Sequence, residues 1–163
     1  MSGLRCAVVG AGGAGRAVVR ALATAGAAEV VVVNRSPAPA EHAVALAGPV
    51  ARVGRPEEVG EAALIVNATP LGMGVVVTTA GEPEPLPLDP SRLGPGQVVV
   101  DLVYHPPVTP LLTEARARGA QGINGLGMLI HQAAHAFRLW TREEPPLATM
   151  RAAVGLAEAP ATG

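Results

Sequence analysis

The chain contains no lysine, since all twelve of its basic residues are arginine. No side chain can therefore act as a lysine general base, form a Schiff base or serve as a lysine phosphate ligand. Cysteine is almost absent as well, because Cys6 is the only one, and this excludes an internal disulfide. Cys6 lies in an apolar stretch, where we expect a buried structural thiol rather than a reactive one.

Long apolar runs are also lacking. The sequence is 49% hydrophobic, largely through Ala and Val, but no uninterrupted stretch approaches the roughly 20 residues that span a bilayer, so we expect no membrane partner. The first five residues lead directly into an apolar stretch and leave no room for a signal peptide, which predicts a cytoplasmic protein. The net charge of −1 favours small-molecule chemistry over a nucleic-acid partner.

A glycine-rich turn follows the first apolar stretch. The run from Val8 to Ala17 has glycines at positions 10, 12 and 15, the spacing GxGxxG. Gly10 allows a tight turn, Gly12 lets the backbone approach a pyrophosphate, and Gly15 lets the following helix pack against the strand. The N–H groups and the positive dipole end of that helix would then face phosphates. The pattern alone is also compatible with a purely structural turn.

Strand and helix patterns alternate along the whole chain. The apolar runs predict strands over 4–9, 29–33, 50–53, 63–66, 98–103 and 121–124. The intervening patterns predict helices over 16–25, 41–47, 56–61, 108–118, 127–140 and 147–157. This alternation is typical of α/β proteins and predicts a Rossmann-type, doubly wound parallel sheet in a three-layer αβα arrangement.

The expected domain organisation is simple. The length of 163 residues fits one domain over 1–158, followed by a tail over 159–163. A stretch over 74–96 is rich in Gly, Glu and Pro, and its prolines predict a loop without regular structure.

The residues after the second predicted strand bear on cofactor preference. A Rossmann fold that uses NAD usually places Asp or Glu about 20 residues past the glycine-rich turn. Here that place holds Asn34, Arg35 and Ser36. Because no carboxylate repels a 2′-phosphate and the Arg35 guanidinium can bind one in a bidentate way, NADP is favoured. The alternative is that Arg35 is an ordinary solvated loop residue.

Three further segments follow predicted strands. They read NATP from Asn67, DLVYHP from Asp101 and GLGM from Gly125, and Gln132 lies one turn beyond Met128. Ligands of such sheets bind outside the carboxyl ends of the strands, so these segments are candidates for a site. Polar and glycine-rich turns also end strands without any ligand.

Together these motifs resemble the shikimate dehydrogenase family, specifically its NADP-binding C-terminal domain. The resemblance rests on GAGGAGRAV from Gly10, NRS from Asn34, NATPLGM from Asn67, DLVYHPPVTPLL from Asp101 and GLGMLIHQAAHAFRLWT from Gly125. It covers about 4–154, in the order that the family uses. Members reduce 3-dehydroshikimate to shikimate with NADPH, on the route to chorismate and the aromatic amino acids.

The resemblance implies a role for each matching residue. The pyrophosphate would be held by Gly10, Gly12, Gly13 and Ala14. The adenosine ribose and its 2′-phosphate would be held by Asn34, Arg35 and Ser36. The nicotinamide end would be lined by Thr69, Val103, Gly125 and Met128. The shikimate-type substrate would be reached by Tyr104 and Gln132.

Two departures from the family pattern qualify these roles. Pro39 stands where the family commonly has a second basic residue, which leaves NAD as an alternative cofactor. The family's N-terminal substrate domain, with its Lys/Asp proton-transfer pair, has no counterpart in this sequence. We therefore expect no catalytic residue here and little activity of the chain alone. We also expect no metal site, because no acidic residue accompanies His131 and His135.

Two other functions stay open. One is a non-catalytic NADP-binding module that senses the cofactor or regulates a partner. The other is a different reductase, such as glutamyl-tRNA reductase or methylene-tetrahydrofolate dehydrogenase, which the segments 101–112 and 125–132 disfavour. In the terminal helix, an exposed apolar stripe of Leu147, Met150 and Val154 is expected. That stripe would serve a separate substrate domain or self-association.

Overall fold

The structure, a computed structural model, describes residues 2–74 and 86–156. The chain divides into two compact units, Met1–Asn124 and Gly125–Gly163. Each unit is described by itself, and the single domain expected over 1–158 stays a prediction.

Parts of two predictions fall outside the described residues. They are the centre of the predicted loop, 75–85, and the last residues of the chain, 157–163, which hold the predicted end of the terminal helix and the tail.

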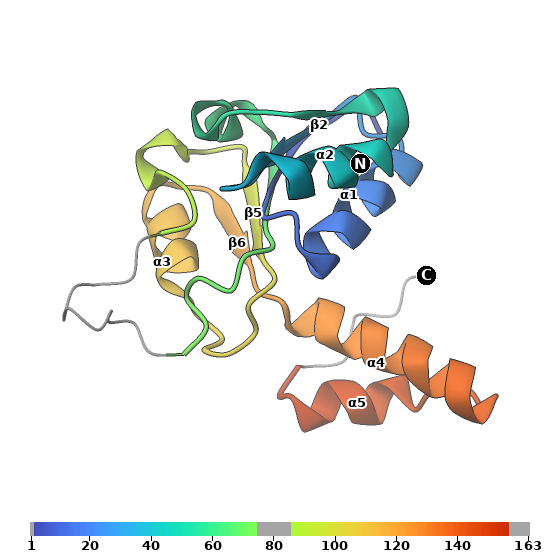
Figure 1. Cartoon of the computed structure of the whole chain (residues 1–163). Coiled ribbons are helices and arrows are strands. Elements are labelled where there is room, and N and C mark those ends of the chain that lie inside the picture. Colours follow the sequence, from blue (N-terminus) through green and yellow to red (C-terminus); the bar gives the residue numbers. More distant parts are fainter. Residues whose placement is uncertain (1, 75–85, 157–163) are drawn as a thin grey trace. The chain divides into compact units, whose positions relative to one another are not determined.

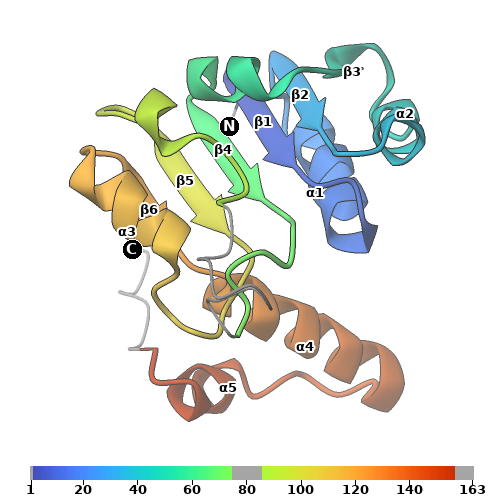
Figure 2. The ribbon, with the colours of Figure 1, turned by 60° about the vertical axis from the view of Figure 1, so that its left-hand side comes forward.

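The first unit is built on a parallel sheet (Figures 1 and 2). Its strands are β1 Arg5–Val9, β2 Glu29–Val33, β3 Ala51–Val53, β4 Leu64–Asn67, β5 Val98–Asp101 and β6 Gln121–Ile123. The spatial order is β3-β2-β1-β4-β5-β6, and every neighbouring pair is parallel. This is the strand order of a Rossmann fold, so the predicted fold class is confirmed. The order reverses between β1 and β4, which is where such sheets bind their ligands.

Helices and short turns connect the strands. The helices are α1 Gly13–Thr24, α2 Pro37–Ala45 and α3 Pro110–Ala117. The 3₁₀ turns are Gly48–Val50, Pro56–Glu61 and Pro90–Arg92. Helix α2 begins four residues before the predicted start at 41, because Pro37 and Pro39 lie in its first turn, where the missing N–H groups would have no helical partner. The segment 56–61, predicted as a short helix, is one of the 3₁₀ turns.

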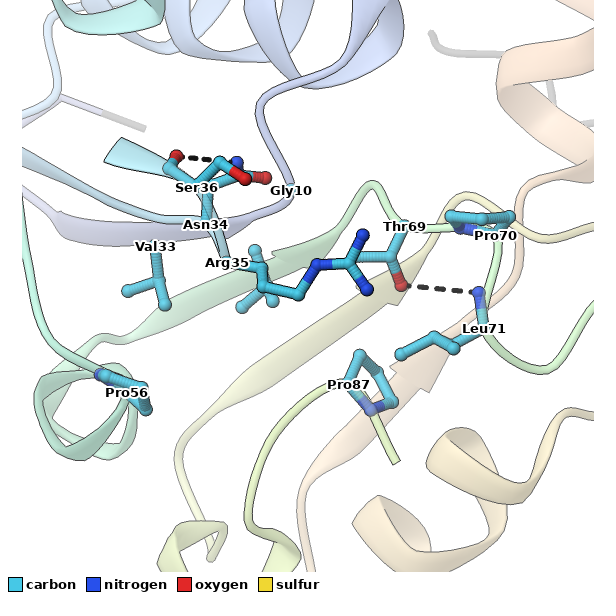
Figure 3. Close-up of a pocket in the computed structure, with 11 residues that line it drawn as sticks. Gly10, Val33, Asn34, Arg35, Ser36, Pro56, Thr69, Pro70, Leu71 and Pro87 are labelled. Carbon is cyan, nitrogen blue, oxygen red and sulfur yellow. Dashed lines mark hydrogen bonds between the residues drawn. The ribbon is translucent and has the colours of Figure 1, made fainter. Parts of the chain in front are cut away.

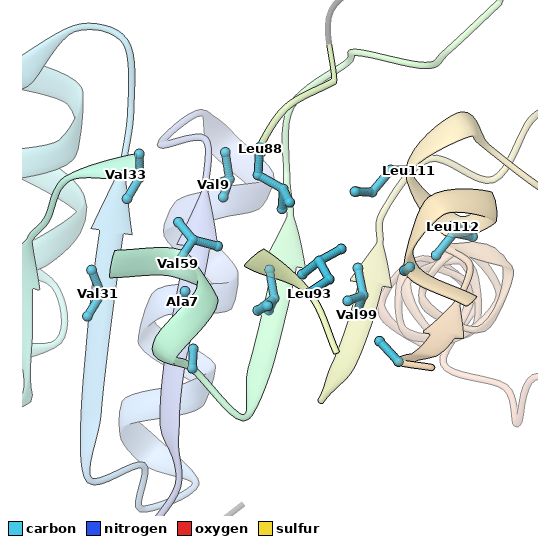
Figure 4. Close-up of a cluster of buried hydrophobic side chains, with 14 residues drawn as sticks. Ala7, Val9, Val31, Val33, Val59, Leu88, Leu93, Val99, Leu111 and Leu112 are labelled. Atoms are coloured by element: carbon cyan, nitrogen blue, oxygen red, sulfur yellow. The ribbon is translucent and has the colours of Figure 1, made fainter. Parts of the chain in front are cut away.

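The core consists of two apolar clusters, one on each face of the sheet. Successive residues of β1 alternate between them: Cys6 and Val8 join the cluster that includes α1 and α2, whereas Ala7 and Val9 join the one that includes α3 (Figure 4). Each fully buried Val or Leu side chain contributes about 1.5–3 kcal/mol. The three-layer arrangement follows from this alternation, because a parallel sheet with two apolar faces needs a covering layer on each.

The second unit consists of α4 Leu126–Thr141 and α5 Leu147–Ala153, which contact each other. The stripe of Leu147, Met150 and Val154, which was expected to be exposed, is intermediate in exposure. Among the described residues of this unit, the exposed large apolar side chains are Leu139 and Trp140 on α4. Within the described residues, no helix combines the length and apolar character that a membrane span requires.

A network of ion pairs joins β1, β2 and β3 to the turn at Pro56–Glu61. The Arg52 Nε lies 2.7 Å from Glu29 Oε1, and the Arg52 Nη2 lies 2.7 Å from Glu58 Oε1. The Arg5 Nε lies 2.8 Å from the other oxygen of Glu29. The hydrogen bond from Arg52, followed by one from the Arg55 N–H, lowers the pKa of Glu58 from 4.5 to about 2.

This lowered pKa makes stability depend on pH. Because the pKa of Glu58 is lower in the folded state, its contribution is present above about pH 4.5 and is lost as the pH falls towards 2. We predict that the free energy of unfolding falls less steeply between pH 6 and pH 3 in Glu58→Gln than in the wild type. Urea denaturation at a series of pH values measures this. The control is Glu57→Gln, because Glu57 is exposed. Equal pH profiles for the wild type and Glu58→Gln would contradict the assignment.

Candidate functional site

The first unit has a pocket of about 440 Å³ at the carboxyl ends of β1, β2 and β4 (Figure 3). Its lining residues are Val9, Gly10, Val33, Asn34, Arg35, Ser36, Pro56, Thr69, Pro70, Leu71 and Pro87. The pocket lies beside the β1/β4 reversal, the position expected for a ligand site. It brings together five predicted residues that are far apart in the sequence, namely Gly10, Asn34, Arg35, Ser36 and Thr69.

Two glycines hold the loop after β1 against its neighbours. Gly10 has φ +101°, a backbone conformation that residues with a side chain rarely adopt. Its N–H donates to the Val33 carbonyl at 2.8 Å. A Cβ on Gly10 would lie 2.9 Å from the Ala68 carbonyl carbon, at the end of β4. A Cβ on Gly15 would lie 2.0 Å from the Gly10 oxygen. Only glycine at these two positions lets α1 start so close to the end of β1.

The other positions of the loop leave an open cradle. A Cβ on Gly12 or Gly13 would meet no atom within 4 Å. Gly12 is the residue that precedes α1, no side chain caps this helix, and its first turn carries no acidic residue. The first N–H groups of a helix have no intrahelical partner, and the helix dipole is positive at this end. Gly12, Gly13 and Ala14 therefore offer space and donors for a phosphate group.

Asn34 ties this loop to the segment after β2. The Ala11 N–H donates to Asn34 Oδ1 at 3.0 Å, and Asn34 Nδ2 donates to the Ser36 carbonyl at 2.9 Å (Figure 3). The resemblance implied a contact between Asn34 and the adenosine ribose. In the structure, both ends of the side-chain amide bind the protein backbone, so Asn34 sets the position of Arg35 and Ser36 relative to the glycine loop.

Arg35 gives the pocket its positive charge. It is exposed, and it makes no hydrogen bond or ion pair with the residues that the structure describes. Figure 3 shows its side chain extending across the pocket in the direction of Thr69. None of the described residues that line the pocket is acidic. A guanidinium without a carboxylate partner is suited to bind a phosphate.

Thr69 lines the same pocket as Arg35. Its expected place at the nicotinamide end stays a prediction. Its N–H and its hydroxyl both donate to Asn67 Oδ1, at 3.0 and 2.7 Å. Because Asn67 is fully buried at the end of β4, these two bonds fix Thr69 at the rim of the pocket.

The remaining predicted residues lie outside this pocket. The Val103 side chain is buried, so it can offer a ligand only its backbone, whereas Tyr104 is 40% exposed just beyond β5. Gly125, Met128 and Gln132 belong to the second unit. There the Gly125 carbonyl accepts from the Leu129 N–H at 2.9 Å, and Gln132 is exposed on α4.

Sequence reasoning missed several residues that line the pocket. Pro56 lies in the connection after β3, whereas Leu71 and Pro87 both lie in the connection after β4. Leu71 belongs to the segment NATPLGM, but no local motif marks Pro56 or Pro87. Within the two described ranges, no group of three or more His, Cys, Asp or Glu side chains could hold a metal ion.

The strand order, the glycine turn and the pocket at the β1/β4 reversal define a Rossmann-type domain, of the class that binds dinucleotides. Two family models match the sequence. The shikimate / quinate 5-dehydrogenase model matches residues 1–70, and the shikimate 5′-dehydrogenase C-terminal domain model matches residues 125–154. The chain belongs to the shikimate dehydrogenase family.

Individual relatives agree with this assignment. Shikimate dehydrogenase (NADP(+)) of Moorella thermoacetica is 45% identical over 162 residues, which cover 91% of this chain and 52% of that protein. The structure of Thermus thermophilus shikimate 5-dehydrogenase with NADP(H) and shikimate has a TM-score of 0.75 at 40% identity, covering 94% of this chain and 54% of that one.

A structure named as a quinate dehydrogenase has the same fold. Quinate dehydrogenase from Corynebacterium glutamicum in complex with NAD has a TM-score of 0.79 at 34% identity, covering 93% of this chain and 55% of that one. The chain therefore spans about half the length of the relatives that it matches.

The geometry of the glycine loop predicts a large effect on stability for one substitution and a small effect for another. Gly15→Ala places a methyl group against the Gly10 oxygen and should lower the free energy of unfolding by about 2–3 kcal/mol or more. Gly12→Ala adds the same methyl group in open space, at a negative φ of −71°, and should change stability by less than about 0.5 kcal/mol. Chemical denaturation of both variants measures the difference. Similar stabilities would contradict the close approach of α1 to β1.

Proposed function

We propose that this chain is the NADP-binding part of a shikimate dehydrogenase, an oxidoreductase that reduces 3-dehydroshikimate to shikimate. The observation that carries the proposal is the open phosphate cradle beside a pocket with a free guanidinium, Arg35, in a chain of this family. When bound, the cofactor would supply the hydride. The residues of this chain would bind and orient it.

Each part of the dinucleotide has a candidate partner. The pyrophosphate would accept hydrogen bonds from the backbone of Gly12, Gly13 and Ala14 at the start of α1. Arg35 and Ser36 would hold the 2′-phosphate of the adenosine, and Thr69 would line the same pocket. The nicotinamide half would then lie on the other side of the β1/β4 reversal, over the ends of β4 and β5, near the backbone of Val103.

The arginine after β2 supports NADP over NAD. A carboxylate at this place would bind the ribose 2′-hydroxyl and repel a 2′-phosphate, whereas Arg35 attracts it. The relative from Moorella thermoacetica carries NADP(+) in its name, although the related quinate dehydrogenase structure holds NAD. Because Pro39 stands in place of a second basic residue, the preference for NADP depends mainly on Arg35 and Ser36. We therefore propose that the chain also binds NAD weakly.

Calorimetric titration of the purified chain tests the preference. We predict that NADPH binds more tightly than NADH, and that Arg35→Ala weakens NADPH binding about 10- to 100-fold, because one charge-assisted contact contributes about 1.5–3 kcal/mol. NADH binding should change less than about twofold. Arg20→Ala, at an exposed position of α1, is the matched control. Gly12→Ala should weaken both ligands, because its methyl group fills the cradle.

Two outcomes would contradict this assignment. One is a wild-type chain that binds NADH as tightly as NADPH. The other is an Arg35→Ala variant that loses both ligands equally.

The substrate would be met by residues beyond β5 and on α4. We propose that Tyr104 and Gln132, which are both exposed, contact the shikimate-type substrate. Reduction of a ketone also needs a proton donor for the developing alkoxide. With no lysine, the chain cannot supply the lysine of the family's Lys/Asp pair. The family's substrate domain is therefore its proposed partner, joined to it or separate. Self-association through α5 and a cytoplasmic location stay predictions from the sequence.

Without that domain, catalysis should be very slow. We predict that the purified chain oxidises shikimate with NADP⁺ at least about 10²–10⁴-fold more slowly than a complete relative, because general acid–base catalysis alone contributes that much. The rate of NADPH formation, measured at saturating NADP⁺, checks this. Turnover close to that of a complete relative would overturn the assignment of the proton-transfer groups to the other domain.

A non-catalytic NADP-binding module is the second candidate function. The observation that favours it is a complete pocket and phosphate cradle in a chain without any lysine. Mixing the chain with the separately expressed substrate domain of a relative distinguishes the two functions. Recovered shikimate oxidation supports the enzyme, whereas NADPH binding without recovered turnover supports the module.

A further inference from the structure

Three polar side chains are buried in the described part of the first unit, and they form one cluster. Asn67 and Asp101 are fully buried, and Thr109 is 1% exposed. Asn67 and Asp101 are paired in register as the last residues of β4 and β5. Thr109 directly precedes α3. Buried polar groups are costly unless they are hydrogen-bonded, so their meeting at the carboxyl end of the sheet calls for an explanation.

The Asp101 carboxylate is the centre of this cluster. Its Oδ1 accepts from Asn67 Nδ2 at 2.9 Å and from the Val103 N–H at 3.1 Å, and its Oδ2 accepts from the Thr109 hydroxyl at 2.6 Å. In the described residues, no arginine forms an ion pair with it. Three donors thus replace the cation that usually accompanies a buried carboxylate.

The cluster fixes both ends of the segment after β5. At its start, the Val103 N–H binds Asp101. At its end, Thr109 binds the same carboxylate, and its hydroxyl oxygen also accepts from the Leu112 N–H at 3.3 Å, which caps α3. The segment 102–108 is therefore a loop whose two ends meet on one side chain. Near its end, Asn124 Nδ2 donates to the Pro107 carbonyl at 3.1 Å.

This loop lies where the proposed cofactor would end. A dinucleotide with its adenosine beside Arg35 and its pyrophosphate at the start of α1 would cross β1 and β4, and would place the nicotinamide over the ends of β4 and β5. Asp101 itself is fully buried, so it acts on a ligand only through the backbone that it holds. The adenosine pocket is attached to the other side of the cluster, through Asn67 and Thr69.

We propose that Asp101 is a positioning residue for the nicotinamide half of the cofactor. Through Val103 and Thr109 it holds the loop 102–108 in the conformation that contacts this half, while the adenosine half binds independently of it. The inference rests on the proposed function. The positioning role differs from a merely structural role. A weakened cluster should impair binding of the nicotinamide half of the cofactor and leave binding of the adenosine half unchanged.

The test compares two ligands in titration calorimetry, NADPH and 2′-phospho-ADP-ribose, which lacks the nicotinamide. Thr109→Val removes the hydrogen bond to Asp101 Oδ2 at nearly constant volume. We expect it to weaken NADPH binding about three- to tenfold, and to change 2′-phospho-ADP-ribose binding by less than about twofold. The fluorescence of bound NADPH, which reports the surroundings of the reduced ring, should move towards that of free NADPH.

Matched variants distinguish the positioning effect of the hydrogen bond from effects of the Asp101 charge and of protein stability. Thr109→Ser keeps the hydroxyl and should restore wild-type binding. Asp101→Asn should also stay close to wild type, because its oxygen can accept both N–H groups while its NH₂ donates to Thr109. Thr113→Val, on α3, removes a hydroxyl that binds only the Thr109 carbonyl among the described residues, and is the control for stability. If Thr109→Val does not fold, Asn124→Ala loosens the same loop at Pro107 and should act in the same direction.

Other outcomes would contradict either the positioning role of Asp101 or the proposed function of the chain. Equal losses for both ligands, or for neither, in a folded Thr109→Val or Asn124→Ala variant would overturn the positioning role. So would a wild-type chain that binds the two ligands equally, or an Asp101→Asn variant that loses NADPH binding while Thr109→Val keeps it. A folded wild-type chain that binds neither ligand would instead overturn the proposed function.

Discussion

The close approach of α1 to the end of β1 is the constraint on which the rest of the structure depends. It exists because Gly15 has no side chain to collide with the Gly10 carbonyl, and because Gly10 adopts a positive φ against the end of β4. The approach places the first N–H groups of α1 at the carboxyl edge of the sheet, beside the reversal in its strand order. The empty space next to Gly12 and Gly13 then becomes a place for phosphate, without any charged side chain in the loop.

The charged side chains near this edge of the sheet differ in whether they are paired. Arg5 and Arg52 bind Glu29 and other carboxylates in a network outside the pocket, so their charges are compensated. Arg35, by contrast, has no carboxylate partner among the described residues, and no acidic residue is among the described residues that line its pocket. The carboxylate of Asp101 is close to the same sheet edge but is buried under three hydrogen bonds. Among the described residues of the pocket, the charge of Arg35 is therefore not compensated by a carboxylate.

Much of this could be predicted from the sequence, because it depends on local patterns. The strand Glu29–Val33 was predicted to the residue, since a run of four valines between a helix-ending glycine and a polar turn leaves little choice. The start of α2 was placed four residues too late, because residues 37–40 were assigned to the approach to the helix although Pro37 and Pro39 lie in its first turn. The place of Thr69 beside Arg35, and the pocket contacts of Pro87, depend on how distant segments converge, and the backbone role of Asn34 depends on loop geometry. No periodicity or spacing contains that information.

We propose that a dinucleotide lies across the β1/β4 reversal with its phosphates on the glycine loop and on Arg35. A crystal structure of the chain with NADP⁺ would test this placement. We expect pyrophosphate oxygens within hydrogen-bonding distance of the backbone N–H groups at Gly12 and Gly13, and the 2′-phosphate against the Arg35 guanidinium. An occupied ligand whose phosphates lie elsewhere, with the loop at Gly12 left empty, would contradict it.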